Sequence, residues 1–460
     1  MVGNDHSENM NRTRPTRRRF VKTTGAAITM GSLAGCSMLG GGSRSLHFIT
    51  DQSAPEMQEL MDQAFQDWES SYDEDVEAEF EYMGFSEVPQ TMNQQLSAGD
   101  PPDMALQRVT EITQYGAEGH LSDLSEVADD MDIEIPEYLN ISFDGDRIVI
   151  PHYQDHVSRF YRVDKYEEAG VEPADSWPDQ DAQVLQTLDE ELQTQGSMRA
   201  KLVVANPEGE PTQWFADTHM FNNGVDYIQR DGDDINVTID QEPIAGKAAE
   251  TLEYLNNIYQ YSVPSQSHSW GDMVNSYVNE SVATVNYVGG RLLGAIHENN
   301  PDIAEYTKPA APPRSPANVN GSEDYRIRSA TQGFCIPEEA EGADLAKDFL
   351  TFFMNSDYYT ESLLTVPLHK IPFDMDVLDS DAFQSNELVQ AHQDYVDHIK
   401  EYQQYQTPGG AFATDPPTPQ FNSLTVGSNI IPTMIGSVLL QDTDPSEAVA
   451  TAGQALRDEL

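Results

Sequence analysis

In the first part of the chain, short apolar runs alternate with segments in which apolar residues recur every three or four positions. A short apolar run over 46–50 predicts a strand, and apolar positions at three- and four-residue steps over 57–68 predict a helix with one buried face. The alternation continues with strands predicted over 76–80 and 104–106 and a helix between them over 88–96. Strands that alternate with helices in this way indicate a mainly parallel α/β sheet, whose ligands bind beyond the carboxyl ends of the strands.

The same kind of pattern extends to the end of the chain. Short apolar runs over 148–150, 201–205 and 282–287 predict further strands. Helical spacing predicts a helix over 343–354 and a last helix that Asp444 caps. With 460 residues, the chain is long enough for two or three domains and a large buried core.

Acidic residues dominate the composition. Asp and Glu number 78 and Lys and Arg only 25, a net charge of −53, which excludes a protein that binds the phosphate backbone of nucleic acids. Apolar residues still make up 38% of the chain, so the acid belongs to a folded surface. An acidic, Lys-poor surface is typical of a protein that works in molar salt, where the screening length falls to about 3 Å. We therefore interpret the chain as halophilic.

The N-terminus has the opposite charge and resembles an export signal. Residues 1–35 contain a string, 16–22, that resembles the twin-arginine export consensus, followed by an apolar stretch too short to span a membrane. The four residues that end at Cys36 resemble a lipobox, so we expect cleavage before Cys36 and lipidation of its thiol. Residues 36–45 are then a flexible tether. These features predict an exported protein anchored to the outer face of the cell membrane.

Cysteine and histidine chemistry adds no catalytic centre. With Cys36 acylated, Cys335 has no disulfide partner, and its apolar surroundings predict a buried structural thiol. His152 and His156 flank an acidic residue, but in a strand they would lie about 13 Å apart, which argues against a metal site. No cofactor and no metal are expected.

Several separated strings occur in one familiar order. In that order they resemble the sugar-binding family of extracellular solute-binding proteins of ABC importers, which includes maltose-binding protein. The likeness covers about residues 45–460, with Arg162-Val163 in place of the family's usual Asn-Lys pair and Val149 in place of a common Tyr. The strings are LSAGDPPD (96–103), GHLSDL (119–124), DGDRIVIP (144–151), FYRVDKYEEAG (160–170), SWP (176–178), AKDFL (346–350) and VPLHKIP (366–372).

This resemblance implies a periplasmic-binding-protein-like α/β fold. Two α/β lobes are joined by a multi-segment hinge, with a ligand cleft between them. The chain would leave the first lobe near Gln154, return near Pro309 and cross again near Asn355. The lobes implied are residues 46–154 plus 310–355 for lobe 1, and residues 156–308 plus 358–460 for lobe 2.

The resemblance also implies a function that involves no chemical change. The protein would be a substrate-binding lipoprotein that captures an extracellular solute, a sugar or oligosaccharide, and delivers it to an ABC permease with a cytoplasmic ATPase. Its partners would be a small-molecule carbohydrate, that permease and, through the lipid, the membrane. It would act as a monomer and bind no nucleic acid.

Sugars present hydroxyl groups above apolar ring faces, so their sites combine aromatic rings with polar side chains that form paired hydrogen bonds. Asp51 and Gln52 follow the first strand, and Gln107 and Arg108 follow the third, where the family's cleft loops lie. Asp155 occupies a position similar to that of an acidic sugar ligand in maltose-binding proteins. These five residues are candidates for the ligand site.

Four further candidates come later in the chain. Trp214 and Trp270 could stack on a sugar ring, although Trp270 also suits a core position. Gly290 and Arg291 follow a predicted strand where the family commonly has Gly-Trp, and an inward-pointing Arg291 would favour an anionic solute.

Two other classes of function remain as alternatives. A secreted glycoside-acting enzyme needs two carboxylates about 5–10 Å apart, and a chain with so much acid offers many such pairs. No nucleophile elbow, H-E-x-x-H or P-loop string occurs, so nothing in the sequence argues for catalysis. A surface receptor without a transport role is the other alternative.

Overall fold

The fold is taken from a computed structural model. It describes residues 44–72, 76–84, 87–136, 139–143, 145–177, 179–231, 234–318, 325–408, 424 and 428–460. The predicted signal peptide, Cys36 and the predicted tether up to residue 43 lie outside this range. Among the described residues, no helix is both long enough and apolar enough to cross a membrane.

The first lobe is built on the parallel strands that the periodicity predicts. β1 pairs in parallel with β2 on one side and β3 on the other, and β11 adds to β3 in the antiparallel sense. The strand predictions over 46–50, 76–80 and 104–106 are confirmed, and β1 begins two residues earlier than predicted, inside the predicted tether. The bounds are β1 Arg44–Thr50, β2 Val76–Tyr82, β3 Met104–Arg108 and β11 Ile327–Cys335.

Helices cover both faces of this sheet. On one face α1 and α11 pack against β1 through a cluster of aromatic rings that includes Phe48, Phe65 and Phe349. On the other face α2 and α3 bury Met92 and Ile112. The helices predicted over 57–68, 88–96 and 343–354 are thus confirmed. Their bounds are α1 Pro55–Glu69, α2 Glu87–Ala98, α3 Val109–Ala117 and α11 Ala343–Met354.

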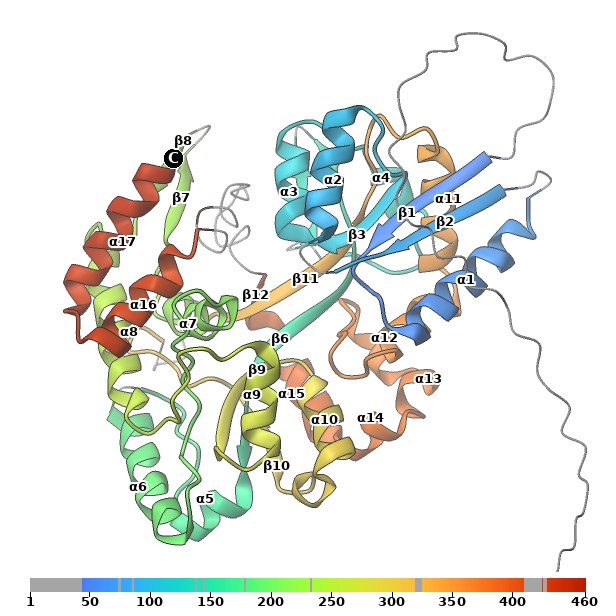
Figure 1. Ribbon diagram of the computed structural model, residues 1–460. Coiled ribbons are helices and arrows are strands. Elements are labelled where there is room, and N and C mark those ends of the chain that lie inside the picture. Colours follow the sequence, from blue (N-terminus) through green and yellow to red (C-terminus); the bar gives the residue numbers. More distant parts are fainter. Residues whose placement is uncertain are drawn as a thin grey trace, which may run out of the picture. The chain divides into compact units, whose positions relative to one another are not determined.

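One long strand, β6 (Ile150–Arg162), belongs to both lobes. Its first part pairs with β11, and its last residues pair with β9 (Thr284–Val288) and β10 (Thr307–Ala310) in the second lobe. Figure 1 shows β6 and β11 running side by side from one lobe to the other. This two-lobed α/β architecture is the one predicted from the sequence.

Helices form most of the second lobe (Figure 1). They are α5 Val163–Ala169, α6 Asp179–Gln195, α7 Glu210–Asn222, α8 Ile244–Tyr259, α9 Trp270–Val278, α10 Arg291–Asn299, α16 Ile430–Gln441 and α17 Pro445–Glu459, with the hairpin β7 Ile228–Asp231 and β8 Asp234–Val237.

The remaining elements are short or lie between the lobes. They are α4 Ser125–Asp129, β4 Ser142–Phe143, β5 Asp146–Arg147, α12 Asp357–Leu364, α13 Asp381–Gln384, α14 Glu387–Ala391, α15 Gln393–Tyr402, β12 Gln406–Pro408 and the 3₁₀ turns Pro301–Ile303, Met375–Asp379 and Gln403–Tyr405.

The strand predicted over 201–205 is wrong. The segment is buried and its Leu202 amide donates to the Thr284 carbonyl at 2.9 Å, but it forms no strand. A fully buried apolar run satisfies the hydrophobic pattern whether or not its backbone joins a ladder, so the pattern alone could not distinguish the two cases.

The structure places the residues near the expected crossings as follows. Gln154 lies in β6. Pro309 lies in β10, paired with Phe160, and the chain returns only through β11. A third segment passes beside β6 at Ile371, whose backbone exchanges two hydrogen bonds of 2.8 Å with that of Gln154. The Pro-rich composition of residues 308–318 indicates an irregular segment, but it does not indicate the lobe to which that segment belongs. The exact limits of the lobes stay a prediction.

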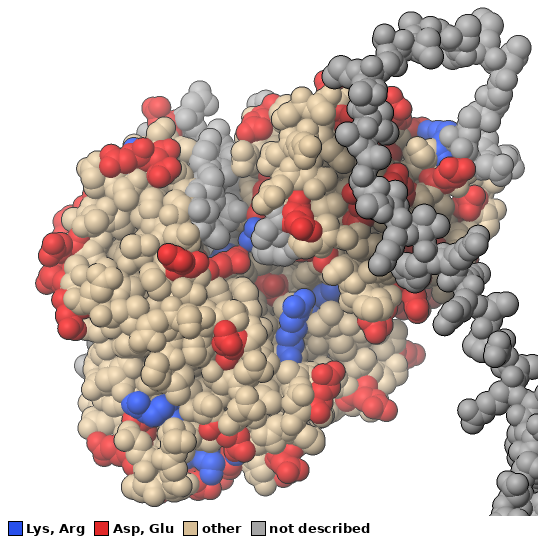
Figure 2. Space-filling view, in the orientation of Figure 1, with Lys and Arg blue, Asp and Glu red and all other residues tan. Residues whose placement is uncertain are grey.

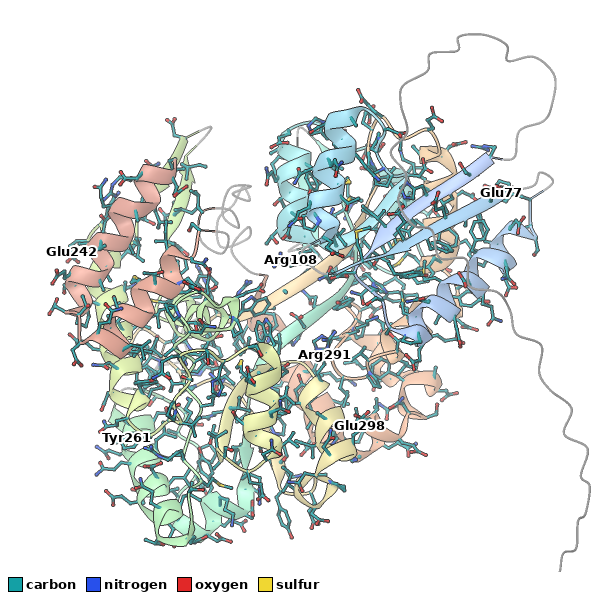
Figure 3. All side chains as sticks on the ribbon, in the orientation of Figure 1. Glu77, Arg108, Glu242, Tyr261, Arg291 and Glu298 are labelled. Carbon is teal, nitrogen blue, oxygen red and sulfur yellow. The ribbon has the colours of Figure 1, made fainter. Side chains whose placement is uncertain are left out.

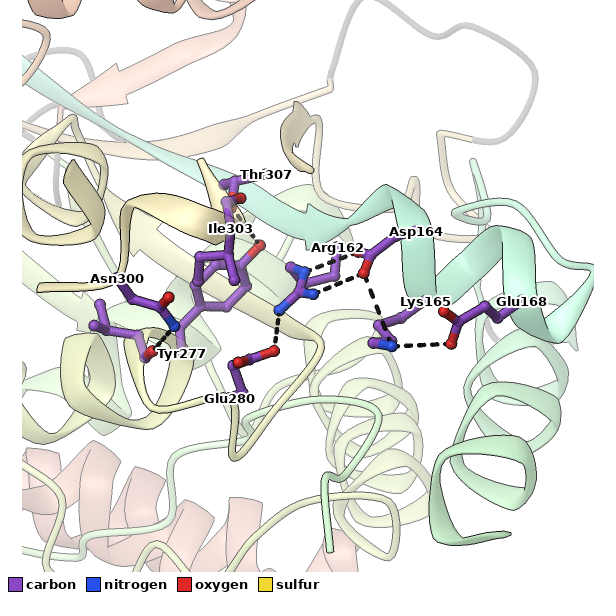
Figure 4. A network of polar contacts seen from close by, with 10 residues as sticks. Arg162, Asp164, Lys165, Glu168, Tyr277, Glu280, Asn300, Ile303 and Thr307 are labelled. Carbon is purple, nitrogen blue, oxygen red and sulfur yellow. Dashed lines mark hydrogen bonds and ion pairs between the residues drawn. The ribbon is translucent and has the colours of Figure 1, made fainter. Parts of the chain in front are cut away.

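Arg162 explains one departure from the family pattern. Its guanidinium donates to Asp164 Oδ1 at 2.8 Å and Oδ2 at 2.7 Å, and to Glu280 Oε2 at 2.6 Å (Figure 4). The same network includes Lys165, whose Nζ lies 2.9 Å from Glu168. The residue that ends β6 thus ties the start of α5 to the turn before β9.

Two local predictions are confirmed in detail. Asp444 is the N-cap of α17, and its side chain accepts hydrogen bonds from the amides of Ser446 and Glu447. Cys335 is a fully buried free thiol, and burial raises its pKa to about 12. A thiol in that state is a structural apolar group, not a nucleophile.

Candidate functional site

A cavity of about 620 Å³ lies where residues from both lobes meet, a size within the range of small-molecule sites. The loops after β1, β2 and β3 line it from the first lobe. The N-terminal ends of α7, α9 and α10 line it from the second lobe, and β6 and β11 contribute residues between them. The cavity therefore lies beyond the carboxyl ends of the parallel strands, where the topology predicts a ligand.

Most of the predicted ligand residues come together here. Arg108 and Arg291, labelled in Figure 3, approach the cavity from opposite lobes. The predicted residues that line the cavity are Asp51, Gln52, Arg108, Asp155, Trp214, Trp270 and Arg291.

Two predicted residues do not line the cavity. Gln107 precedes Arg108 on β3, so its side chain points to the opposite side, where Nε2 lies 3.8 Å from Cys335 Sγ in the core. Gly290 packs against the backbone of Leu368, and a Cβ there would lie 2.6 Å from the Leu368 carbonyl carbon. Gly290 therefore brings two chain segments into contact and is not part of the cavity wall.

Asp155 lies on β6 between the two lobes. Its Oδ1 accepts a hydrogen bond of 3.0 Å from the Ala330 amide of β11. Burial raises its pKa to about 7, while that hydrogen bond and the charges of Arg328 and Arg291 act in the opposite direction. An ionised carboxyl accepts hydrogen bonds from hydroxyl groups, and a protonated one can also donate.

Arg108 is held by carboxylates on both sides of the cavity. It pairs with Glu111 in its own helix, and its Nη1 lies 3.0 Å from Glu210 Oε1 at the start of α7. Trp214 Nε1 donates to the same Glu210 oxygen at 3.3 Å. This chain of contacts joins the first lobe to the second across the cavity.

Aromatic rings form one wall of the cavity. Trp270 is half-buried and stands nearly perpendicular to Trp214, at 5.7 Å between ring centroids, and to Tyr287, at 5.9 Å. The Arg328 guanidinium covers one face of Trp214 at 3.9 Å and lies 3.3 Å from Asp217. Because Trp270 is the more exposed of the two tryptophans, it is the better platform for a sugar ring.

The sequence did not identify the residues that the loop after α12 contributes. His369 and Lys370 line the cavity, together with Tyr153 of β6. Burial, together with the charge of Arg291, lowers the pKa of Lys370 to about 7, while the charge of Asp51 acts in the opposite direction. One signal was available, since Lys370 is one of only eight lysines in the chain and lies in a string similar to the family's turn.

Both acidic and basic side chains line the cavity. Figure 2 shows Asp and Glu scattered over both lobes; some of the fewer Lys and Arg lie in the hollow between the lobes, and others lie on the outer surface. The basic residues that line the cavity are Arg108, Arg291 and Lys370. Within the described residues, no cluster of three or more His, Cys, Asp or Glu could hold a metal ion.

Residues 52–360 match the family of bacterial extracellular solute-binding proteins. The chain belongs to this family. The match spans well over half of the chain and includes both sides of the cavity. A comparison with curated proteins finds no match.

Solved structures share the fold of this solute-binding protein. The GacH receptor of Streptomyces glaucescens, determined unliganded and with acarbose, has a TM-score of 0.69 at 16% identity, covering 91% of this chain and 98% of that one. Maltose-bound MalE3 of T. maritima has a TM-score of 0.68 at 16% identity, covering 90% and 100%. A solute-binding protein of Thermotoga lettingae bound with α-D-tagatose has a TM-score of 0.67 at 18% identity, covering 90% and 99%. The predicted fold class is thereby confirmed.

As a solute-binding protein, the chain needs contacts from both lobes to its ligand. A ligand shifts the balance between open and closed states only through interactions that differ between them. Here the polar groups and aromatic rings come from both lobes, so a solute that touches both favours closure. The family and the similar structures are binding proteins.

Proposed function

We propose that this solute-binding protein captures an extracellular sugar or oligosaccharide and delivers it to an ABC permease. The observation that carries the proposal is the composition of the cavity. Trp270 supplies a half-buried aromatic ring that lines the cavity, and Asp155, Gln52 and Asp51 supply carboxyl and amide groups suited to paired hydrogen bonds with hydroxyl groups.

The ligands of similar structures support this solute class. Proteins with this fold bind acarbose, maltose, α-D-tagatose and a cyclic maltosyl-maltose. At identities of 16–18% the individual sugar does not carry over, and the proposal is limited to the carbohydrate class.

The cellular setting is part of the same proposal. The protein is exported through the twin-arginine route, lipidated at Cys36 and anchored outside the cell, where it works as a monomer in molar salt. The basic string at 16–22 and the lipobox-like string ending at Cys36 support the first three points, and the net charge of −53 supports the last.

A thermal-shift panel in molar KCl tests the binding function. A solute present at 100 times its Kd should stabilise the folded protein by about 2.7 kcal/mol and raise the melting temperature. One carbohydrate class should give that shift, with the solute recovered unchanged. The matched control is Tyr358→Phe, which removes a surface hydrogen bond to Asp67 on the α1 side and should shift as the wild type does.

Two results would count against the proposal. Turnover of a glycoside by the purified protein would make it an enzyme. A panel in which no carbohydrate shifts the melting temperature, while another class of solute does, would remove the substrate class.

A further inference from the structure

One corner of the cavity has basic side chains without acidic partners. Arg291 is the first residue of α10, is exposed and lines the cavity. Lys370 lines the same cavity, although it is only 2% exposed. Among the described residues, no carboxylate oxygen lies within 4.0 Å of either charge. In so acidic a chain, unpaired cations inside a cavity require an explanation.

Chain packing holds these two cations at the same corner. A Cβ on Gly289 would lie 2.5 Å from His369 Nδ1, so the backbone just before Arg291 contacts the turn that carries His369 and Lys370. Lys370 Nζ is positioned by hydrogen bonds to Thr365 Oγ1 at 2.9 Å and to the Ser362 carbonyl at 3.3 Å. The amine is thus held in place by neutral acceptors and makes no ion pair with a described residue, although the charge of Asp51 acts on it from a distance.

The carboxyl groups of the cavity are occupied elsewhere. Glu210 accepts from Arg108 and Trp214, and Asp155 accepts from the Ala330 amide. Asp51 is the acid closest to this corner, but its Oδ1 accepts from Gln52 Nε2 at 2.6 Å, and burial raises its pKa. None of them neutralises Arg291 or Lys370 by a direct contact.

Helix ends add positive potential to the cavity. The residues at the start of α1, α3 and α10 are Ala54, Arg108 and Gly290, and none of them caps its helix with a side chain. Ala54 and Arg108 line the cavity directly, and Arg291 does so one residue after Gly290. Backbone amides at such uncapped ends favour a negative charge.

We propose that the solute is an acidic saccharide whose carboxylate is bound by Arg291 and Lys370, while its ring lies against Trp270. The inference rests on the proposed function and narrows its substrate class. A planar carboxylate matches the fork of an Arg side chain. A single negative charge fits better than a phosphate dianion, because three carboxyl groups line the same cavity.

The test compares uronic acids with the neutral sugars that share their rings. Titration calorimetry in molar KCl measures glucuronate against glucose and galacturonate against galactose, as free sugars and as short oligosaccharides, with glucose 6-phosphate as a third arm. We expect the uronic member of one pair to bind roughly ten- to a hundredfold more tightly than its neutral partner. The phosphate should bind more weakly than the carboxylate.

Variants assign the preference to the two cations. Arg291→Gln and Lys370→Met should each reduce the preference for the acidic sugar, measured as the ratio of its affinity to that of its neutral partner, by roughly tenfold. Arg457→Gln, which removes a cation paired with Asp240 on the surface, is the matched control and should keep the full preference.

The outcomes separate this inference from the proposed function. If neutral sugars bind as tightly as the uronic acids, or if the preference survives in both variants, the acidic-saccharide inference is wrong and the carbohydrate function stands. If the phosphate binds most tightly, the carboxylate assignment is wrong. If no saccharide of either kind binds, both proposals fail.

Discussion

Two pairs of basic side chains in this protein have opposite surroundings. In the core of the second lobe, Arg159 and Lys201 both lie beside Asp181, at 3.3 Å and 3.7 Å, and Tyr254 donates to the same carboxylate at 2.7 Å. At the cavity corner, Arg291 and Lys370 lie close together with no carboxylate in contact with either among the described residues.

The difference separates a structural cation from one available to a ligand. A charge removed from water needs a partner, since leaving it unpaired costs several kcal/mol. In the core the chain supplies that partner itself. At the corner it supplies only neutral acceptors and leaves the cations open to a molecule that enters from outside. The predictions below test this contrast, beginning with the largest expected effect.

Removing the shared acid of the core should be the most damaging change. Asp181→Asn leaves Arg159 and Lys201 buried without a counter-charge, so we expect a loss of about 3–5 kcal/mol in the free energy of unfolding. Urea unfolding in molar KCl measures it. Asp379→Asn, at an exposed ion pair, is the control. A loss of less than about 1 kcal/mol at Asp181 would show that the core charges do not depend on it.

Stability at the cavity corner should depend on pH in the alkaline range. The pKa of Lys370 falls from 10.5 in the unfolded chain to about 7 in the folded protein. Between these values the unfolded state binds more protons, so stability rises with pH, by at most about 1.4 kcal/mol per pH unit, and below pH 7 the full penalty remains. Lys370→Met should lack this rise.

Unfolding curves of both proteins between pH 7 and pH 10 provide the measurement. Subtracting the variant removes the contribution of Asp51, Arg291 and the other groups near Lys370. If the free energy of unfolding rises equally with pH in wild type and variant, Lys370 keeps its charge in the folded protein. Burial would then not lower its pKa.

The aromatic wall should contribute to affinity and not to charge selection. Trp270→Ala removes a half-buried ring that lines the cavity, and we expect binding of the preferred sugar to weaken by about 1 kcal/mol, or roughly fivefold. Trp270→Phe keeps an aromatic face and should lose less. Calorimetry with both members of a sugar pair shows whether the acidic and the neutral sugar lose the same binding free energy. Unequal losses would mean that Trp270 also contributes to the selection of charge.

The smallest effect is expected at an exposed pair. Lys400 Nζ lies 2.6 Å from Asp379 Oδ1, with both side chains in contact with solvent. Lys400→Met should change the free energy of unfolding by less than about 1 kcal/mol, and by less still in molar salt. A double-mutant cycle with Asp379→Asn measures the pair itself. A coupling as large as that at Asp181 would erase the distinction between core and surface charges.

Local sequence patterns determined most of the first lobe. The period-two and three-to-four spacings in residues 46–106 correctly placed β1, α1, β2, α2 and β3, because a strand or helix that packs against one sheet shows its burial in its own sequence. The order of short strings also led to the correct family and fold class. The loops after these strands line the cavity, and the ligand role of their side chains stays a prediction.

The same patterns failed where burial comes from every side. Residues 201–205 are apolar throughout, and that property carries no information on whether the backbone joins a sheet. Gln107 and Arg108 are adjacent on β3, and only the direction of the pleat decided that Arg108 faces the cavity and Gln107 the core.

What the sequence by itself determined is the family and the strands and helices of residues 46–106, since both are recorded in short stretches of the chain. The tertiary structure alone decided that Lys370 joins Arg291, from a distant part of the chain, through the contact of Gly289 with His369. The sequence around either residue does not indicate that Lys370 and Arg291 lie close together. Their proximity results from the packing of the second lobe against the loop after α12, and such long-range contacts leave no periodic signal in the sequence.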